Sequence, residues 1–225
     1  MHIEPSVVDD AKIVLSYVTA LGAFGGAAKM SYDTVRVSGA VPYAMRSAIA
    51  TALVFFFFEV LPHHPVGVSE VHLILGSTLL LLFGAGPAAV GLSLGLLLQG
   101  IFFAPFDLPQ YGMNVTTLLV PLFAINQIAK RLIPQETPYV EVTYRQTLAL
   151  SSAYQGGIVL WVAFWALYGQ GFTAANLANV TMFGAAYMSV VVVEPLLDLA
   201  VLAMAKSLRK FTEGPAFVSR LHSAA

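Results

Sequence analysis

The start of the chain carries a histidine beside the terminal amine, a spacing that can chelate a metal ion. The Met1 amine and the His2 backbone nitrogen close a five-membered ring on a metal, and that nitrogen and His2 Nδ1 close a six-membered ring. The three nitrogens are coplanar when the amide is deprotonated, which favours Ni²⁺ and Cu²⁺ and also suits Co²⁺. One place in the plane stays open, so the fold must supply a fourth donor.

His72 is the histidine best placed to fill that open position, because it lies at the outer end of an apolar segment. His63 and His64 fall in the preceding polar loop, where an interfacial role satisfied by water or a carbonyl is the simpler interpretation. We therefore expect Met1, His2 and His72 to be the metal ligands. Ni²⁺ and Co²⁺ both accept these donors, so either is a candidate substrate.

Other polar residues are candidates to orient these ligands. An amide or a carbonyl that accepts the second N–H of a metal-bound imidazole fixes the orientation of the ring. An amide left unsatisfied in lipid costs several kcal/mol, so amides in spanning helices are expected to point into the bundle. The candidates for this supporting role are His64, Ser69, Gln99 and Asn114.

Three charged residues form a separate group at the inner half of the predicted bundle: Arg46, Glu194 and Asp198. An unpaired charge at that depth costs at least about 2.5 kcal/mol, so we expect these residues to pair with one another. A proton relay is the alternative interpretation.

The composition indicates which elements must position these residues. Of the 225 residues, 58% are hydrophobic and 10% are charged, whereas soluble domains carry about 25% charged residues. With a mean hydropathy of +0.78, the apolar surface must face lipid. The formal net charge of −1 gives no electrostatic footprint for nucleic acid, and the absence of cysteine leaves only nitrogen and oxygen donors for a metal.

Apolar runs predict an all-α, polytopic bundle of about seven transmembrane helices. Their ranges are residues 11–28, 39–61, 71–84, 87–104, 114–132, 147–169 and 178–205. The third and fourth are separated by the turn chemistry of residues 84–87, Gly-Ala-Gly-Pro. We assign residues 1–206 to one transmembrane domain with an N-terminal metal-binding segment, and residues 207–225 to a short cytoplasmic tail.

The distribution of Lys and Arg predicts the orientation in the cell membrane. Basic residues fall in alternate loops and in the C-terminal tail, and the opposite side carries Lys12. The positive-inside rule therefore places the N-terminus outside and the C-terminus in the cytoplasm. Residues 1–10 contain no Lys or Arg, so they lack the basic region of a signal peptide, and we expect Met1 to be retained.

No sequence motif for ATP binding or hydrolysis is present. The chain contains no Walker A motif, no GxSxG and no HExxH. We therefore expect a transport component and not an enzyme, with any uphill transport energised by another protein.

The sequence resembles the CbiM/NikM family, the metal-capturing membrane components of energy-coupling factor ABC transporters for nickel and cobalt. The resemblance covers about residues 1–130 and lies in the opening MHI and in the stretches HHPVGVSEVHLILGSTLLLLFGAGPAAV, LLLQGIFF and GMNVTTLLVP. The chain departs from the family pattern at Glu4-Pro5-Ser6, where an acidic residue followed by Gly is usual, and at Met113, where Ala is usual.

The resemblance implies both a ligand set and partners. In this family the N-terminal segment folds back into the bundle and binds the ion through the Met1 amine, the His2 amide and imidazole, and a further His, which matches His72. Asn114 falls on the Asn of the family pattern. The implied partners are ATPase subunits and a coupling transmembrane subunit, with a small accessory membrane protein in many cases.

Three other functions are compatible with parts of the pattern. A capture component for a vitamin, or a secondary transporter for an organic substrate, would have inward-facing aromatic residues and no dependence on Met1. A haem protein would need paired histidines on facing helices, and among the histidines His72 alone is near a span. A purely structural assembly factor is the remaining alternative.

Overall fold

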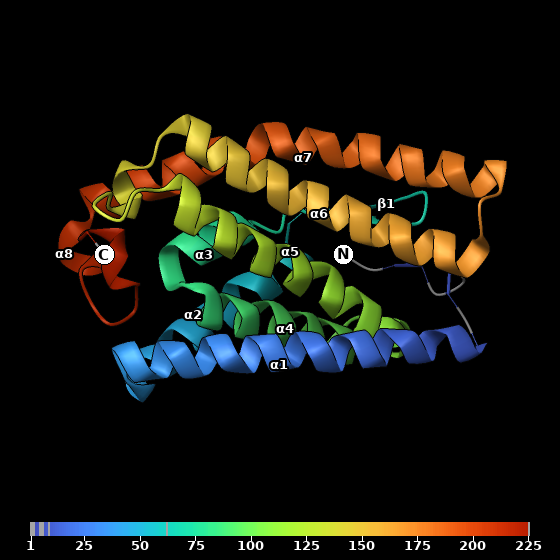
Figure 1. Ribbon diagram of the computed structural model, residues 1–225, viewed down its shortest axis with the longest axis horizontal. Helices are drawn as coiled ribbons and strands as arrows, with labels where there is room; N and C mark the ends of the chain where they lie inside the picture. Colours follow the sequence, from blue (N-terminus) through green and yellow to red (C-terminus); the bar gives the residue numbers. More distant parts are fainter. Residues whose placement is uncertain (1–2, 5–6, 9, 62, 225) are drawn as a thin grey trace.

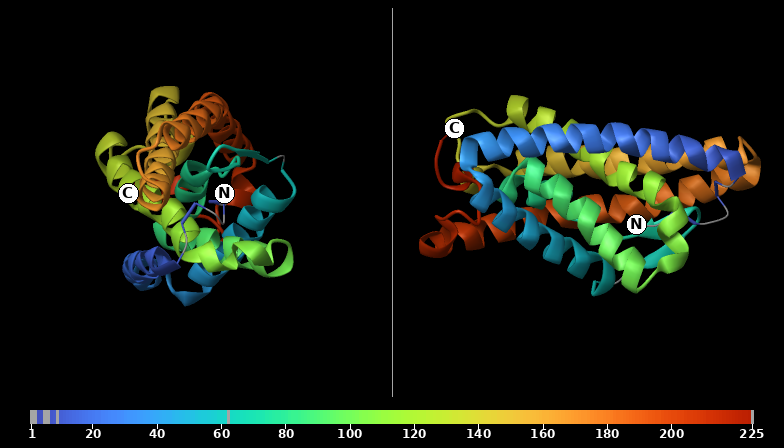
Figure 2. Two further views of the ribbon diagram at one scale, coloured as in Figure 1. Left: turned by 90° about the vertical axis from the view of Figure 1, so that its right-hand side faces the viewer. Right: turned by 90° about the horizontal axis from the view of Figure 1, so that it is seen from below.

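The computed structural model describes residues 3–4, 7–8, 10–61 and 63–224 and shows an all-α helical bundle (Figure 1). Its main helices are α1 (Ile13–Ser38), α2 (Ala40–Glu59), α3 (Gly76–Phe83), α4 (Ala85–Phe102), α5 (Tyr111–Leu132), α6 (Tyr144–Gln170) and α7 (Ala174–Ser207). The short elements are η1 (Asp10–Lys12), β1 (His64–Val66), β2 (Ser69–Val71), η2 (Pro105–Gln110), η3 (Tyr139–Glu141), α8 (Arg209–Thr212) and η4 (Ser219–Leu221). Seen end-on in Figure 2, the helices surround a filled interior.

Six helical segments among the described residues are long and apolar enough to cross a membrane. Large apolar side chains point outward from them, as at Leu21 and Leu160, which are 72% and 73% exposed. Such an outer surface suits lipid and not water, because lipid tails are as apolar as these side chains. The prediction of a multi-pass, all-α membrane protein is confirmed.

The prediction of a spanning helix over residues 71–84 is wrong. Val71 ends strand β2, residues 72–75 have no regular secondary structure, and α3 contains only 8 residues. At a rise of 1.5 Å per residue, such a helix is about 12 Å long, less than half of the hydrocarbon core. Every residue of α3 is buried, so the segment passes through the inside of the bundle. The predicted break is confirmed, because α3 ends at Phe83 and Gly84 adopts a φ of +87°.

The bundle has two ends, which we call the hairpin end and the tail end. The hairpin end holds the β1–β2 hairpin, the start of α1 and the end of α6. Lys12, just before α1, donates from Nζ to the carbonyls of Tyr168 and Gly169 on α6 at 3.2 and 3.1 Å. The tail end is formed by residues 208–224, where the Val218 N–H donates to the Leu82 carbonyl at 2.8 Å. The inner segment 72–83 therefore runs from the hairpin end towards the tail end, and residues 10–12 and 219–221 lie at opposite ends (Figure 1).

The β1–β2 hairpin was not predicted. Its strands pair antiparallel with Val66 opposite Ser69, which leaves Gly67 and Val68 as a two-residue loop. Gly67 has a φ of +63°, and glycine is the residue that accepts a positive φ at this position of a tight hairpin. A Cβ on Gly67 would overlap the backbone carbonyl of Asn179, so the hairpin packs closely on the first turns of α7.

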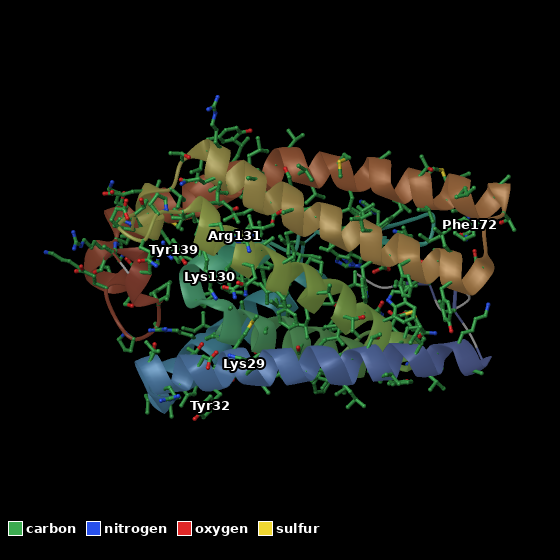
Figure 3. The ribbon with its side chains drawn as sticks, in the orientation of Figure 1. Lys29, Tyr32, Lys130, Arg131, Tyr139 and Phe172 are labelled. Atoms are coloured by element: carbon green, nitrogen blue, oxygen red, sulfur yellow. The ribbon has the colours of Figure 1, made fainter. Side chains whose placement is uncertain are left out.

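Basic residues gather towards the tail end. Figure 3 shows Lys29, Lys130 and Arg131 in the tail half of the bundle and Phe172 at the hairpin end. This separation agrees with the sequence distribution from which the orientation was inferred. The placement of the tail end in the cytoplasm remains a prediction.

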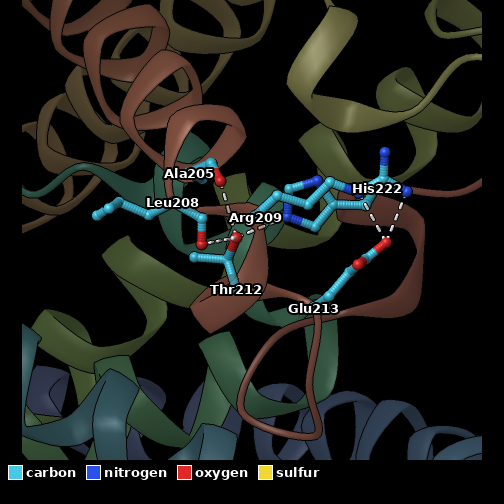
Figure 4. A network of polar contacts seen from close by, with 6 residues as sticks. All are labelled: Ala205, Leu208, Arg209, Thr212, Glu213 and His222. Atoms are coloured by element: carbon cyan, nitrogen blue, oxygen red, sulfur yellow. Dashed lines mark hydrogen bonds and ion pairs between the residues drawn. The ribbon is translucent and has the colours of Figure 1, made fainter.

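The tail end is folded against the helices (Figure 4). The Thr212 Oγ1 donates to the Ala205 carbonyl at 2.8 Å and lies 2.7 Å from His222 Nε2, which joins two parts of the tail. The Arg209 side chain forms an ion pair with Glu213 at 2.6 Å, and this contact lowers the pKa of the exposed Glu213 carboxyl. Helix α8 is thereby fixed beside the end of α7.

The predicted pairing of Arg46 with Glu194 or Asp198 is wrong. Arg46 Nε donates to the Pro215 carbonyl at 2.9 Å, and Nη1 donates to Ser38 Oγ at 3.4 Å. The tail folds over the beginning of α2 and supplies a carbonyl, so Arg46 binds neutral oxygens in place of a carboxylate.

Candidate functional site

The N-terminal segment enters the bundle at the hairpin end. Ile3 is fully buried, and its N–H donates to Asn114 Oδ1 on α5 at 2.9 Å. Ile3 also forms an antiparallel bridge with Ser69, and the Glu4 N–H donates to the Val68 carbonyl at 3.2 Å. Residues 3–4 therefore lie beside strand β2 like a third strand and are held on one side by Asn114.

Two predicted ligands, Met1 and His2, lie outside the described residues. They directly precede Ile3, which anchors their chain between Asn114 and Ser69. Ile3, the first described residue of the segment, is therefore already inside the protein. Its bridge partner Ser69 lies three positions before His72 in the sequence. Met1 and His2 remain proposed ligands.

His72 is buried, with 1% of its surface exposed. Its Nε2 lies 2.9 Å from Glu70 Oε2, its ring stacks on His63 with centroids 4.9 Å apart, and the edge of Phe58 approaches at 5.1 Å. Its backbone carbonyl accepts a hydrogen bond from Tyr187 at 3.4 Å. A carboxylate on one imidazole nitrogen fixes the tautomer and makes the other nitrogen a better metal ligand.

The supporting residues expected from the sequence fall in different places. Asn114 and Ser69 are buried and contact the N-terminal segment through Ile3. Gln99 is buried on α4, and the residue after it, Gly100, lines with Asn114 a cavity of about 10 Å³. His64 is exposed on β1, and it is His63 that contacts His72.

The surroundings of the N-terminal segment are acidic. Burial raises the pKa of the Glu4 carboxyl, and the nearby charges of Glu70 and Asp107 raise it further. The charges of Glu70 and Asp107 thus act on Glu4 where the segment enters, and such an acidic region attracts cations. Within residues 3–4, 7–8, 10–61 and 63–224, no group of three His, Cys, Asp or Glu side chains can hold a metal ion.

Sequence reasoning missed Glu70, although a signal for it exists. Glu70 and His72 are two positions apart, and in a strand residues i and i+2 lie on the same face. Recognising the alternating stretch around Gly67 as a hairpin would have placed both side chains together. Asp107 and Tyr187 gave no such local signal, because only tertiary packing brings them to this place.

Comparisons with known proteins agree with this architecture. The sequence model described as CbiM, cobalt uptake substrate-specific transmembrane region, matches residues 2–211. A solved structure described as the crystal structure of a transition metal transporter aligns with a TM-score of 0.70, covering 93% of this chain and 94% of that chain at 18% sequence identity. At this identity the likeness supports the fold alone. No curated protein matches the sequence.

Proposed function

Because the chain belongs to the CbiM family of cobalt uptake substrate-specific transmembrane regions, we propose that it captures Ni²⁺ or Co²⁺ with nitrogens of its N-terminal segment and of His72. The membership and the membrane fold make it a multi-pass component of metal uptake. The donor set is the finer part of the proposal: the Met1 amine, the His2 amide and imidazole, and the His72 imidazole.

A single observation carries this donor set. Ile3 is buried and hydrogen-bonded to Asn114, and it pairs with Ser69, the first residue of strand β2, which leads to His72. Two residues span at most about 7 Å, so the anchor at Ile3 limits where the Met1 and His2 nitrogens can bind an ion. The N-terminal anchor thus supports a chelate that is completed by a ligand from the inner segment.

The contacts of His72 suit a nitrogen ligand. The Nε2–H donates to the Glu70 carboxylate, so the metal would be bound through Nδ1. Stacking on His63 and the edge contact with Phe58 hold the ring in one orientation. The ion would exchange one of its waters for the Nδ1 of a ring whose orientation is set before it arrives.

The space beside the N-terminal anchor favours an ion over an organic substrate. The cavity that Asn114 lines has a volume of about 10 Å³, whereas pockets for organic ligands hold about 300–1,000 Å³. This cavity therefore has no room for a vitamin or another organic substrate.

Transport requires partners under this proposal. The sequence has no ATP-binding motif, so a separate ATPase acting through a coupling transmembrane subunit would drive release towards the tail end. An additional small membrane protein is a further expected partner.

The decisive experiment measures Co²⁺ binding by protein that starts at Met1 and by protein with extra residues before Met1. The extension converts the terminal amine to an amide, so Co²⁺ binding should be lost, and proteolytic removal of the extension should restore it. His72→Ala should weaken binding strongly, while His222→Ala at the tail end serves as the matched control. Equal Co²⁺ binding by the extended and native proteins would refute the donor set.

A further inference from the structure

Two carboxylates lie inside the bundle, away from the candidate capture site. Glu194 and Asp198 are one turn apart on α7, and both are fully buried. Residues i and i+4 of a helix share one face, so the two carboxyl groups point to the same place. Acidic residues inside a membrane bundle are costly to bury and commonly mark a pathway for ions or protons.

The described partners of this pair are neutral. Ser77 Oγ donates to Asp198 Oδ2 at 2.7 Å and lies 3.4 Å from Glu194 Oε1, so one hydroxyl bridges both carboxylates. Thr78 Oγ1 donates to the other oxygen of Asp198. Ser151 Oγ and Gln155 Nε2 each donate to Glu194 Oε2 at 2.6 Å.

These hydrogen bonds stabilise negative charge without cancelling it. The ion pairs formed by the described residues all lie elsewhere in the chain. Arg46, the cation expected here from the sequence, is instead bound by the tail. Two buried negative charges at one place need a positive partner or a bound proton, and the described side chains provide no cation there.

Two further buried oxygen atoms next to the pair also lack a described partner. Gln155 Oε1 is buried with no hydrogen bond among the described residues, and the same amide is tied to Glu194 through its nitrogen. The Tyr154 hydroxyl is likewise buried without a described partner, and its phenol ring packs directly on Gly76, the neighbour of Ser77. Buried polar atoms normally have partners, so these oxygens are available to accept from, or bind to, a water or a ligand.

The cluster lies inward of His72 along two elements. Ser77 and Thr78 follow His72 on the inner segment, and the α7 residue that contacts the His72 carbonyl is Tyr187. Glu194 comes about two turns after Tyr187, roughly 10 Å further towards the tail end. The cluster therefore lies on the tail side of His72.

We propose that Glu194 and Asp198, together with the hydroxyls of Ser77 and Thr78, form a second, oxygen-lined binding site for a divalent cation. Carboxylate and hydroxyl oxygens suit hard divalent ions such as Mg²⁺ and Mn²⁺, and a charge of +2 balances both carboxylates. The role of this site as a relay for the transported metal rests on the proposed function. Its capacity to bind a cation does not depend on Met1, His2 or His72.

The test uses Mn²⁺, because oxygen ligands suit it better than the nitrogen set of the capture site does. Binding to the purified full chain is followed by the loss of the EPR signal of free Mn²⁺. The double variant Glu194→Gln, Asp198→Asn should bind Mn²⁺ at least tenfold more weakly. Ser77→Ala, which keeps both carboxylates, should bind severalfold more weakly, and Asp33→Asn on the exposed face of α1 should bind like the native protein.

The His72→Ala variant separates this proposal from the proposed function. It should bind Mn²⁺ as the native protein does, even if Co²⁺ capture is lost. If His72→Ala bound both Co²⁺ and Mn²⁺ as the native protein does, the capture scheme would be refuted and the inner site would stand. Equal Mn²⁺ affinity of the folded double variant and the native protein would overturn the inner site. An infrared band of a protonated carboxyl that persists at saturating Mn²⁺ and disappears in Glu194→Gln would also overturn it, since the pair then holds a proton.

Discussion

The hydrogen bond from Ile3 to Asn114 offers the sharpest test of the N-terminal anchor. Both residues are buried, and the donor and acceptor lie 2.9 Å apart. Asn114→Ala removes the acceptor and leaves a buried N–H unsatisfied, which costs about 1–3 kcal/mol. Since about 1.4 kcal/mol corresponds to a factor of ten, Co²⁺ should bind roughly fivefold to 150-fold more weakly.

Equilibrium dialysis of Co²⁺ against protein that begins at Met1 measures this loss. Asn114→Asp keeps an oxygen acceptor and should retain most of the affinity. Asn126→Ala is the matched control, because Asn126 lies on the same helix but lines a cavity at the tail end. If Asn114→Ala bound Co²⁺ within twofold of the native protein, or if Asn126→Ala lost as much affinity, the anchor would play no part in capture.

Three further perturbations have defined expected outcomes. Co²⁺ affinity should fall as the pH falls, because protons compete for the ligand nitrogens, and dialysis at several pH values checks this. Glu4→Gln should raise the melting temperature of the metal-free protein at neutral pH: the pKa of Glu4 is raised on folding, so its charged form disfavours the folded state above that pKa. Gly67→Ala should lower the melting temperature more than Gly171→Ala, because both glycines have a positive φ but only a Cβ at Gly67 meets backbone, that of Asn179. Equal losses for the two glycine variants would show that the hairpin does not pack on α7.

Hydrophobic runs predicted most of the bundle because lipid-facing helices need long apolar segments. The six long helices and the break at Gly84 follow from this requirement. The failure at residues 71–84 has the same origin. A buried segment surrounded by protein is as apolar as a spanning helix, so composition does not distinguish the two.

The candidate site was predictable only as far as local chemistry reaches. The chelating start of the chain and His72 follow from donor types and spacing, and Asn114 follows from the cost of an unsatisfied amide in lipid and also matches the family pattern. The contact of Asn114 with Ile3, and of Tyr187 with His72, depends on packing between elements far apart in sequence. The predicted pairing of Arg46 was wrong because the guanidinium donates to a backbone carbonyl of the tail. Every residue has such a carbonyl, so residue type gives no signal for this contact.

The short inner segment 72–83 connects the hairpin end of the bundle with the tail end. One end of it carries His72, and the other end is held by the hydrogen bond from Val218 to Leu82. His72 and the Leu82 carbonyl belong to the same segment, so a displacement of the tail at Val218 would act on the segment that carries the imidazole.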